Sequence, residues 1–348
     1  MRSLFAAAAL LALAACQRQS PPPPEATETP APAPVPAPVA PSADAIDADL
    51  LRTQAALDRI GFTPGVLDGH MGLSTRNALE AFQEANGFPV SGEVDEATRA
   101  GLAQAGGIEG TRTITIAPDF AAGPFAPVPR RPADQARMPA LGYASLDEKL
   151  AERFHTTPEV LRRLNPGKAL AAGARVVVPN VGDPQVDPAA PAGAPDWPAT
   201  LANLGVGSLQ PAVERVEVSK SKGVLRAYDA NGTLVAAFTA TMGSDHDPLP
   251  IGRWKILGID RNPRFHYNPD LFWDARPGDK AATLPPGPNG PVGVVWIDLS
   301  KPHYGIHGTP APETIGRAES HGCVRLTNWD AARLAQMVHP GTRVLFKE

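Results

Sequence analysis

One cysteine near the C-terminal end of the chain has neighbours that are typical of a reactive thiol. Cys323 lies in the segment SHGCVRL, residues 320–326, where serine, histidine, glycine and arginine surround it. A structural free cysteine is usually buried among apolar residues, whereas a reactive one has polar or basic neighbours. These residue types predict a nucleophile that a nearby base activates.

Two histidines could act as that base. His321 is two residues from Cys323, and this short spacing strains a direct proton transfer between the two side chains. His307 lies in a separate segment, IHGT at 306–309, and a base is usually brought to its nucleophile from another part of the chain. We therefore expect His307 to be the general base.

The charge on the sulfur could be stabilised by two neighbouring features. Arg325 follows Cys323 by two residues, and on an extended strand this spacing places both side chains on one face. A helix is expected directly after this segment, capped by residues 327–330 with Thr327 first and ending near 338, and its N-terminal dipole would also favour an anion.

Glycines and backbone N–H groups complete the expected site. Gly308 and Gly322 allow a substrate and neighbouring backbone to approach closely, because they carry no side chain. The backbone N–H groups of residues 321–323 are the natural candidates for an oxyanion hole.

A zinc centre is the strongest competing interpretation of these side chains. It would take the ligands His303, His307, His321 and Cys323. However, His303 and His307 belong to an extended segment, where a spacing of four residues does not bring side chains together as it does on a helix. We therefore expect neither a metal nor a cofactor.

The N-terminal residues have the composition of an export signal. A basic start is followed by an apolar run over 4–13, which is too short to cross a bilayer permanently. The segment LAAC at 13–16 resembles a bacterial lipobox, which implies cleavage before Cys16 and lipidation of that cysteine. Gln17 in place of aspartate implies sorting to the outer membrane of a Gram-negative cell. The predicted location is the periplasm, with the chain anchored to that membrane.

Clusters of proline divide the chain into units, and the charge of the chain excludes one class of partner. The 348 residues include 40 prolines, which cluster in expected linkers at 17–46, 106–139 and 182–210. The second of these includes a strand-like stretch at 113–116 ahead of its prolines. Proline fixes its own φ and lacks an N–H donor, so the first linker should form an extended stalk. The net charge is −4, and no basic stripe is interleaved with aromatic residues, so a nucleic-acid partner is not expected.

Two small units lie between these linkers. Residues 47–105 have the periodicity of three short helices, and the segments GVLDG at 65–69 and AFQ at 81–83 resemble a bacterial peptidoglycan-binding repeat. Residues 140–181 have a β-α-α-β order and resemble a lysin-motif domain, which implies binding to glycan strands. The alternative for the second unit is a packing spacer.

The C-terminal part, 211–348, has the pattern of strands. Valines alternate with polar residues at 216–218, and Asn231-Gly232 predicts a hairpin turn. The expected fold class is multidomain α+β, with a small helical bundle, a small β-α-α-β module and this mainly-β domain.

The two histidine-containing motifs and their supporting segments resemble one enzyme family. The segment 307–309 with 320–326, supported by FHYNP at 265–269 and PGPNGPVG at 286–293, is similar to the L,D-transpeptidase catalytic domain of bacterial cell walls. The resemblance extends over roughly 211–347. It implies that Cys323 is the nucleophile and His307 the base, with the Gly308 carbonyl orienting the histidine ring. It further implies that the substrate is contacted by Ser320, His321 and Arg325.

By this resemblance, the protein is an enzyme that forms a thioester on the peptidoglycan stem tetrapeptide. An amine from another stem peptide or from a lipoprotein would then accept the acyl group. Two alternatives remain open from the sequence. Water could be the acceptor, which would make an L,D-carboxypeptidase or an amidase. The chain could also be a non-catalytic envelope tether, although the presence of both His307 and Cys323 argues against that.

Overall fold

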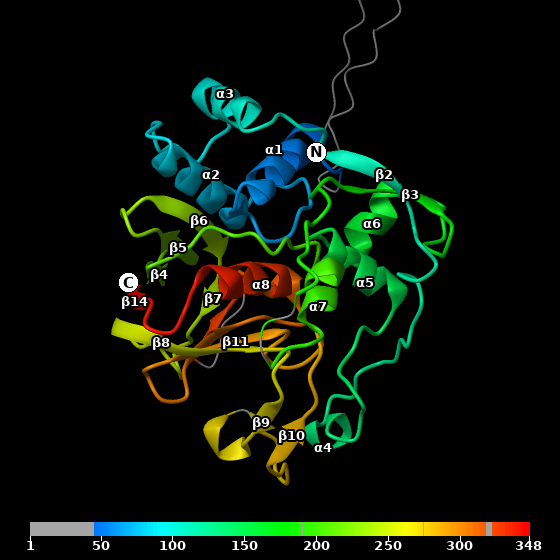
Figure 1. Cartoon of the computed structure of the whole chain (residues 1–348), viewed down its shortest axis with the longest axis vertical. Helices are drawn as coiled ribbons and strands as arrows, with labels where there is room; N and C mark the ends of the chain where they lie inside the picture. The colour runs from blue at the N-terminus through cyan, green and yellow to red at the C-terminus, as the bar shows by residue number, and fades with distance from the viewer. Residues whose placement is uncertain (1–44, 190, 192, 274, 318–321) are drawn as a thin grey trace, which may run out of the picture. The chain divides into compact units, whose positions relative to one another are not determined.

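A mixed β-sheet lies at the centre of the fold (Figure 1). Its strands follow the order β1 (Phe62–Thr63), β6 (Leu234–Thr239), β5 (Val224–Tyr228), β4 (Arg215–Ser219), β14 (Arg343–Lys347), β8 (Gly252–Arg261), β11 (Val295–Leu299), β12 (Gly305–His307), β13 (Val324–Arg325) and β7 (Thr241–Met242). Most neighbours are antiparallel, but three pairs are parallel: β1 with β6, β12 with β13, and β14 with β4. The predicted fold class, with its mainly-β C-terminal domain, is confirmed.

The computed structural model describes residues 45–189, 191, 193–273, 275–317 and 322–348, and residues 46–348 form one compact unit. The predicted export signal with Cys16 lies outside the described residues, as do the linker up to residue 44, Ser320 and His321. Within the described ranges, no helix has the length and apolar character needed to cross a bilayer.

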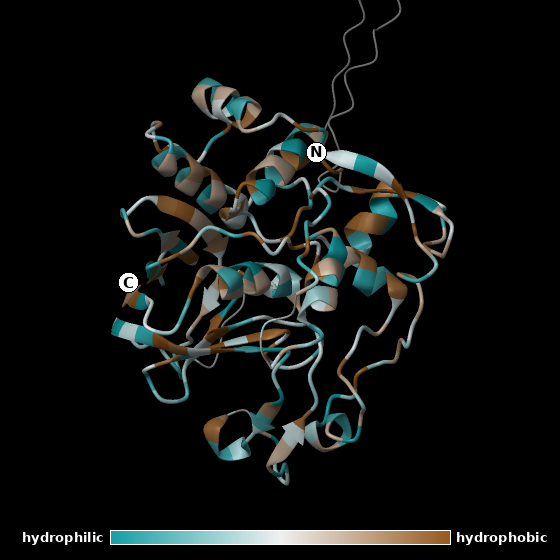
Figure 2. Ribbon diagram, viewed as in Figure 1, coloured by the Kyte–Doolittle hydropathy of each residue, from teal (hydrophilic) through white to brown (hydrophobic). Residues whose placement is uncertain are grey.

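The hairpin between β5 and β6 forms where the sequence predicts it. Asp229 Oδ1 accepts hydrogen bonds from the backbone N–H groups of Asn231 and Thr233, at 2.9 and 2.8 Å. Gly232 takes a φ of +82°, a conformation that glycine adopts without steric cost. The apolar residues of β6 and of β11 are visible in brown in Figure 2, and most of them are buried in the core of the sheet.

Two helices pack together over the sheet. α8 (Asn328–Met337) begins where Thr327 Oγ1 accepts a hydrogen bond from the Asp330 N–H, as the sequence predicts. α7 (Trp197–Leu204) packs against it and lies within 182–210, which was predicted to be only a linker. That prediction is wrong over α7, because its apolar side chains share one face and are buried: Trp197, Leu201 and Leu204.

The N-terminal helical unit is joined to the sheet. It consists of α1 (Ala48–Arg59), α2 (Leu73–Ala85) and α3 (Glu96–Gln104). Its short strand β1 pairs in parallel with β6, with Phe62 opposite Ala237. Leu79, Phe82 and Val224 share one buried cluster, so the helices and the sheet have a common core.

The second small unit takes one of its strands from a predicted linker. α5 (Leu146–Arg153) and α6 (Pro158–Leu164) pack beside β3 (Arg175–Pro179), and β3 pairs with β2 (Thr111–Thr115). The strand-like stretch expected at 113–116 is therefore present as β2, and it belongs to this unit rather than to a linker. Threonine and isoleucine favour strands, and pairing with β3 satisfies the backbone hydrogen bonds of β2.

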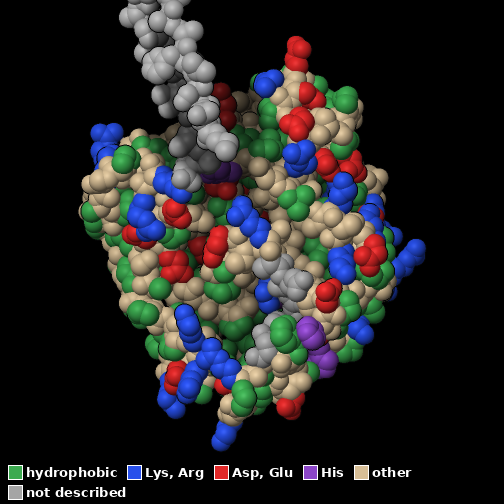
Figure 3. Space-filling model, turned by 180° about the vertical axis from the view of Figure 1, so that it is seen from behind, with side chains coloured by type: hydrophobic (Ala, Val, Ile, Leu, Met, Phe, Trp, Pro, Cys, Tyr) green, Lys and Arg blue, Asp and Glu red, His purple; other side chains and the backbone are tan. Residues whose placement is uncertain are grey.

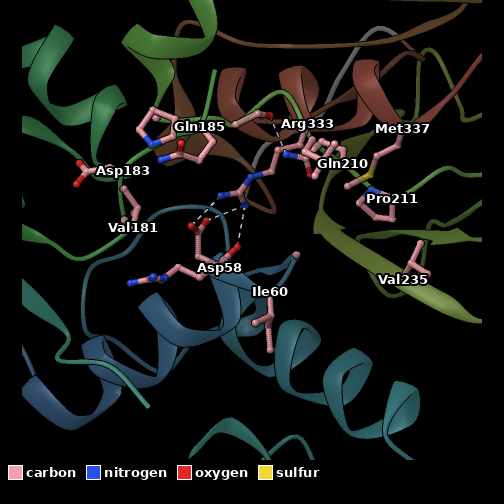
Figure 4. A pocket seen from close by; sticks show the side chains of 17 residues that line it. Asp58, Ile60, Val181, Asp183, Gln185, Gln210, Pro211, Val235, Arg333 and Met337 are labelled. Atoms are coloured by element: carbon pink, nitrogen blue, oxygen red, sulfur yellow. Dashed lines mark hydrogen bonds and ion pairs between the residues drawn. The ribbon is translucent and has the colours of Figure 1, made fainter. Parts of the chain in front are cut away.

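A buried ion pair connects the helical unit to the C-terminal domain (Figure 4). The Arg333 guanidinium donates to both carboxylate oxygens of Asp58, at 3.0 and 2.9 Å. His155 Nδ1 of the second unit lies 3.0 Å from the same carboxylate. Burial raises the pKa of Asp58, but the charges of Arg333 and His155 outweigh it and hold that pKa below its ordinary value. Residues from all three units therefore meet at one carboxylate.

Replacement of Asp58 by alanine is expected to lower the free energy of unfolding by about 3–5 kcal/mol. The buried Arg333 charge then loses both hydrogen bonds to Asp58 and keeps the more distant Asp330, at 3.8 Å, as its acidic neighbour. Urea unfolding of the purified variant measures this loss. The matched control is Asp49→Ala on the same helix, since the Asp49 side chain is 90% exposed and its pair with Arg52 lies in water. That control should change the stability by less than about 1 kcal/mol. Equal losses of stability in the two variants would contradict a stabilising role for the buried ion pair between Asp58 and Arg333.

Candidate active site

The parallel pairing of β12 with β13 brings the two predicted motifs together. His307 lies opposite Arg325 in this register, and the Leu326 N–H donates to the His307 carbonyl at 2.8 Å. Cys323 immediately precedes β13. His307, Cys323 and Arg325 all line one cavity of about 570 Å³.

The side chain of His307 is held in a fixed orientation. Only 4% of His307 is exposed, and its Nδ1 lies 2.7 Å from the Gly308 carbonyl oxygen, so Nδ1 is the donor. Trp296 of β11 stacks on the ring with centroids 5.6 Å apart. Nε2 is then left as the acceptor, which is the role that a general base needs.

Burial keeps the imidazole neutral. Burial, followed by the positive charge of Arg325, lowers the pKa of His307 to about 3, against the opposing effect of the Gly308 hydrogen bond. The ring is therefore unprotonated throughout the range from pH 5 to pH 8. A neutral imidazole in this range can accept a proton.

The thiol of Cys323 is half-buried beside the segment that precedes β12. Its Sγ donates to the His303 carbonyl at 3.8 Å. Burial raises the pKa of this thiol, although the Gly305 backbone and the Arg325 charge act in the opposite direction. The sequence suggested that Arg325 could stabilise a thiolate, but its effect is smaller than that of burial. Before substrate binds, Cys323 is therefore a protonated thiol and His307 a neutral imidazole.

Close packing explains why glycine stands at two predicted positions. Gly322 has a φ of +90°, and a Cβ there would lie 2.6 Å from the Tyr304 ring. Gly308 lies against the amide of Asn328, and a Cβ at this position would collide with Asn328 Oδ1. Both positions therefore require glycine for the two strand ends to fit.

Asn328 and Glu152 support the site and were not identified from the sequence. Asn328 Nδ2 donates to Glu152 Oε1 at 2.8 Å, and its Oδ1 accepts from the Val294 N–H at 3.3 Å. Burial raises the pKa of Glu152 to about 8, so its carboxyl group is protonated at neutral pH. Glu152 comes from α5, far from Asn328 in sequence, and no local pattern could have linked the two residues.

The far side of the cavity is formed by a small two-stranded sheet. β9 (Phe265–Tyr267) pairs with β10 (Ala282–Leu284), and the short helix η1 (Pro269–Leu271) follows β9. Phe272 stacks on Tyr267 with ring centroids 5.4 Å apart. The cavity is thus apolar on this side and carries the reactive groups on the other.

The proposed zinc ligands do not come together among the described residues. No group of three or more His, Cys, Asp and Glu side chains in this part of the chain has the arrangement of a metal site. His303 contributes its carbonyl to the thiol and has an exposed side chain. His321 belongs to the residues that are not described.

Alkylation of Cys323 by iodoacetamide should become faster with rising pH beyond pH 9. The thiolate is the reactive form, and the raised pKa keeps the thiol protonated at neutral pH. The rate should therefore increase about tenfold per pH unit between pH 7 and pH 9. A Cys16→Ser background restricts the reaction to Cys323, and free glutathione in the same buffers is the reference. A plateau below pH 8 would show a resting thiolate instead.

Comparisons with known proteins match two parts of the chain. The family model described as the L,D-transpeptidase catalytic domain, YkuD, matches residues 214–345, and a peptidoglycan binding domain matches residues 47–102. A Bacillus licheniformis protein named as the L,D-transpeptidase YkuD is 30% identical over 200 residues, which cover 57% of this chain and 90% of that protein.

Two further similarities are more limited. An Escherichia coli K12 protein named as the L,D-transpeptidase YbiS is 46% identical over 65 residues, which cover 19% of this chain and only 21% of that protein. The crystal structure of an L,D-transpeptidase from Xylanimonas cellulosilytica covers 90% of this chain and 100% of its own, at 16% identity and a TM-score of 0.36. The catalytic-domain match and the Bacillus relative decide the assignment: this chain belongs to the L,D-transpeptidase family of enzymes that act on peptidoglycan.

Proposed function

We propose that this protein cross-links peptidoglycan, or attaches lipoproteins to it, through an acyl-enzyme on Cys323. The observation that carries the proposal is the pairing of β12 with β13, which places a neutral, buried imidazole and a thiol in one cavity. A thiol needs such a base because burial raises its pKa.

The first half of the reaction forms the thioester. His307 Nε2 accepts the proton of Cys323, and the sulfur attacks the carbonyl between the third stem residue, usually diaminopimelate, and D-alanine. The backbone N–H groups of Gly322 and Cys323 would donate to the developing oxyanion. The C–N bond then breaks, the proton on His307 passes to the leaving amine, and D-alanine departs.

The second half transfers the acyl group. An amine from a neighbouring stem peptide, or from a lipoprotein, attacks the thioester carbon while His307 takes the proton of the amine. Collapse of the intermediate breaks the C–S bond, and the proton returns from His307 to the sulfur. The enzyme is regenerated, and a new amide bond joins the two partners.

The remaining parts of the chain would bring the catalytic domain to the cell wall and hold it there. We propose that lipid on Cys16 anchors the protein to the outer membrane and that the proline-rich linker extends it into the periplasm. The helical unit, which matches a peptidoglycan binding domain, and the second small unit would bind glycan strands. Tethering of this kind raises the local concentration of stem peptides at the active site.

Analysis of muropeptides after reaction of purified protein with isolated cell walls tests the proposal. Dimers joined between the third residues of two stems would support transpeptidation. Tripeptides without dimers would show that water is the acceptor, as in a carboxypeptidase. No change would favour the non-catalytic tether. The Cys323→Ala protein is the matched control, since it retains the wall-binding units and lacks only the thiol.

A further inference from the structure

A segment outside the catalytic domain forms one side of the catalytic cavity. Residues 126–142, here called the strap, span the end of the predicted linker at 106–139 and the first residues of the unit predicted at 140–181, and they contain the short helix α4 (Pro132–Gln135). Figure 1 shows α4 beside β10, and the two elements pack together. The cavity that holds His307 and Cys323 is lined by three residues of the strap: Arg130, Pro132 and Gln135.

Hydrogen bonds hold the strap in this position. The Leu141 N–H donates to the Pro286 carbonyl at 2.9 Å, and the Asn289 N–H donates to the Leu141 carbonyl at 2.9 Å. Near the other end, Gln135 Nε2 donates to the Pro129 carbonyl at 2.8 Å, which closes the turn that carries Arg130. The strap is therefore tied to the catalytic domain at Leu141 and through the packing of α4 against β10, and the turn that carries Arg130 is closed by its own hydrogen bond.

The guanidinium of Arg130 is available for a ligand. It is exposed, and among the described residues it makes no hydrogen bond or ion pair. Figure 3 shows Lys and Arg side chains gathered at the lower end of the molecule, where Figure 1 places α4. Arg130 and Arg325 are the positive side chains that line the cavity, and Asp247 is the carboxylate that does so within the described residues. The two arginines outnumber this carboxylate, and the excess of positive charge favours an anionic ligand.

We propose that Arg130 is a specificity-determining residue that pairs with a carboxylate of the peptide bound in the catalytic cavity. The inference rests on the proposed function, because stem peptides carry free carboxylates on diaminopimelate and on the terminal D-alanine. Arginine suits this role because its planar fork can donate two parallel hydrogen bonds to one carboxylate. The strap would thus make substrate recognition by the catalytic domain depend on a segment that precedes it.

Equilibrium binding tests the proposal independently of turnover. The probe is the tetrapeptide L-alanyl-γ-D-glutamyl-diaminopimelyl-D-alanine, titrated into full-length Cys323→Ala protein by calorimetry. Adding Arg130→Ala should raise the Kd about 10-fold, as expected for loss of a partly solvated charge-assisted hydrogen bond. Adding Arg131→Ala instead should leave the Kd within twofold, since Arg131 is equally exposed but does not line the cavity.

Amidated peptides identify the chemistry that Arg130 recognises. With each carboxylate of the tetrapeptide amidated in turn, the effect of Arg130→Ala should disappear for one form and persist for the others. An effect that persists for every form would overturn carboxylate pairing, and so would equal Kd values for the Arg130→Ala and Arg131→Ala proteins. In the Cys323-containing protein, Arg130→Ala should raise KM and leave kcat within threefold.

These measurements separate the two proposals. If the wild type binds the tetrapeptide through Arg130 but releases no D-alanine from it, the proposed reaction is wrong and the recognition by Arg130 stands. If the wild type releases D-alanine and Arg130→Ala binds equally well, the reaction stands and the role of Arg130 is wrong. If no variant binds the tetrapeptide, the inference about Arg130 is overturned directly.

Discussion

Replacement of Cys323 by alanine is expected to lower the turnover of peptidoglycan by at least about 10³-fold. The sulfur forms the covalent bond to the acyl group in the proposed mechanism, and loss of a covalent nucleophile removes the whole pathway. Release of D-alanine from isolated cell walls measures the loss. Intact-protein mass spectrometry should also detect an acyl adduct on the wild type and none on the variant.

The variant should fold normally, because alanine fills nearly the same space as cysteine and the hydrogen bond from Cys323 Sγ to the His303 carbonyl is long, at 3.8 Å. Its thermal midpoint and its binding to cell walls should therefore match those of the wild type. The Cys16→Ser protein is the matched cysteine control and should keep its activity in solution. Activity of Cys323→Ala within tenfold of the wild type would refute the nucleophile assignment.

Replacement of His307 by alanine should reduce the rate about 10²–10⁴-fold, the usual contribution of a positioned general base. The effect is large here because burial raises the pKa of the Cys323 thiol, so that little thiolate exists at neutral pH without a base. The loss should be measured as kcat/KM at pH 7. It should become smaller as the pH rises above 9, since hydroxide then supplies the thiolate.

His321→Ala is the comparison that distinguishes the two candidate bases. It should cost less activity than His307→Ala, because His321 is expected to contact the substrate rather than to accept the proton. A greater loss in His321→Ala would reverse the base assignment. A loss in His307→Ala that is the same at pH 7 and at pH 10 would indicate a structural role for His307.

The raised thiol pKa could not be predicted from the sequence. The motif placed Arg325 and a helix N-terminus near Cys323, and both features favour a thiolate. The burial of the sulfur decides that its pKa is raised rather than lowered. How deeply the sulfur is buried depends on residues that pack around it from other segments. The neighbouring sequence shows which charges lie close to a group, but it does not show how deeply the group is buried.

The linker at 106–139 gives a similar lesson for the fold. Its prolines and its lack of helical periodicity indicated an extended connection, and this composition gave no sign that Arg130 would line the catalytic cavity. The contacts that anchor the strap join Leu141, which follows this linker, to Pro286 and Asn289, which lie far away in the chain. Such pairs leave no periodic pattern, because each depends on the path of two separate segments.

The sequence by itself determined the chemistry and the main elements. The order of residues around His307 and Cys323 indicated a thiol and a base, alternating valines indicated β4, and Thr327 marked the start of α8. These are local signals, since a cap, a turn or a strand depends mainly on residues near one another in the chain.

Only the tertiary structure decided how the units meet. Asp58, His155 and Arg333 come from three units that appeared separate in the sequence, and they form one buried cluster. Glu152 likewise reaches the active-site end of α8 through Asn328. A buried charge is stable only beside a partner of opposite charge, and the partner is set by the packing of distant segments rather than by the neighbouring sequence.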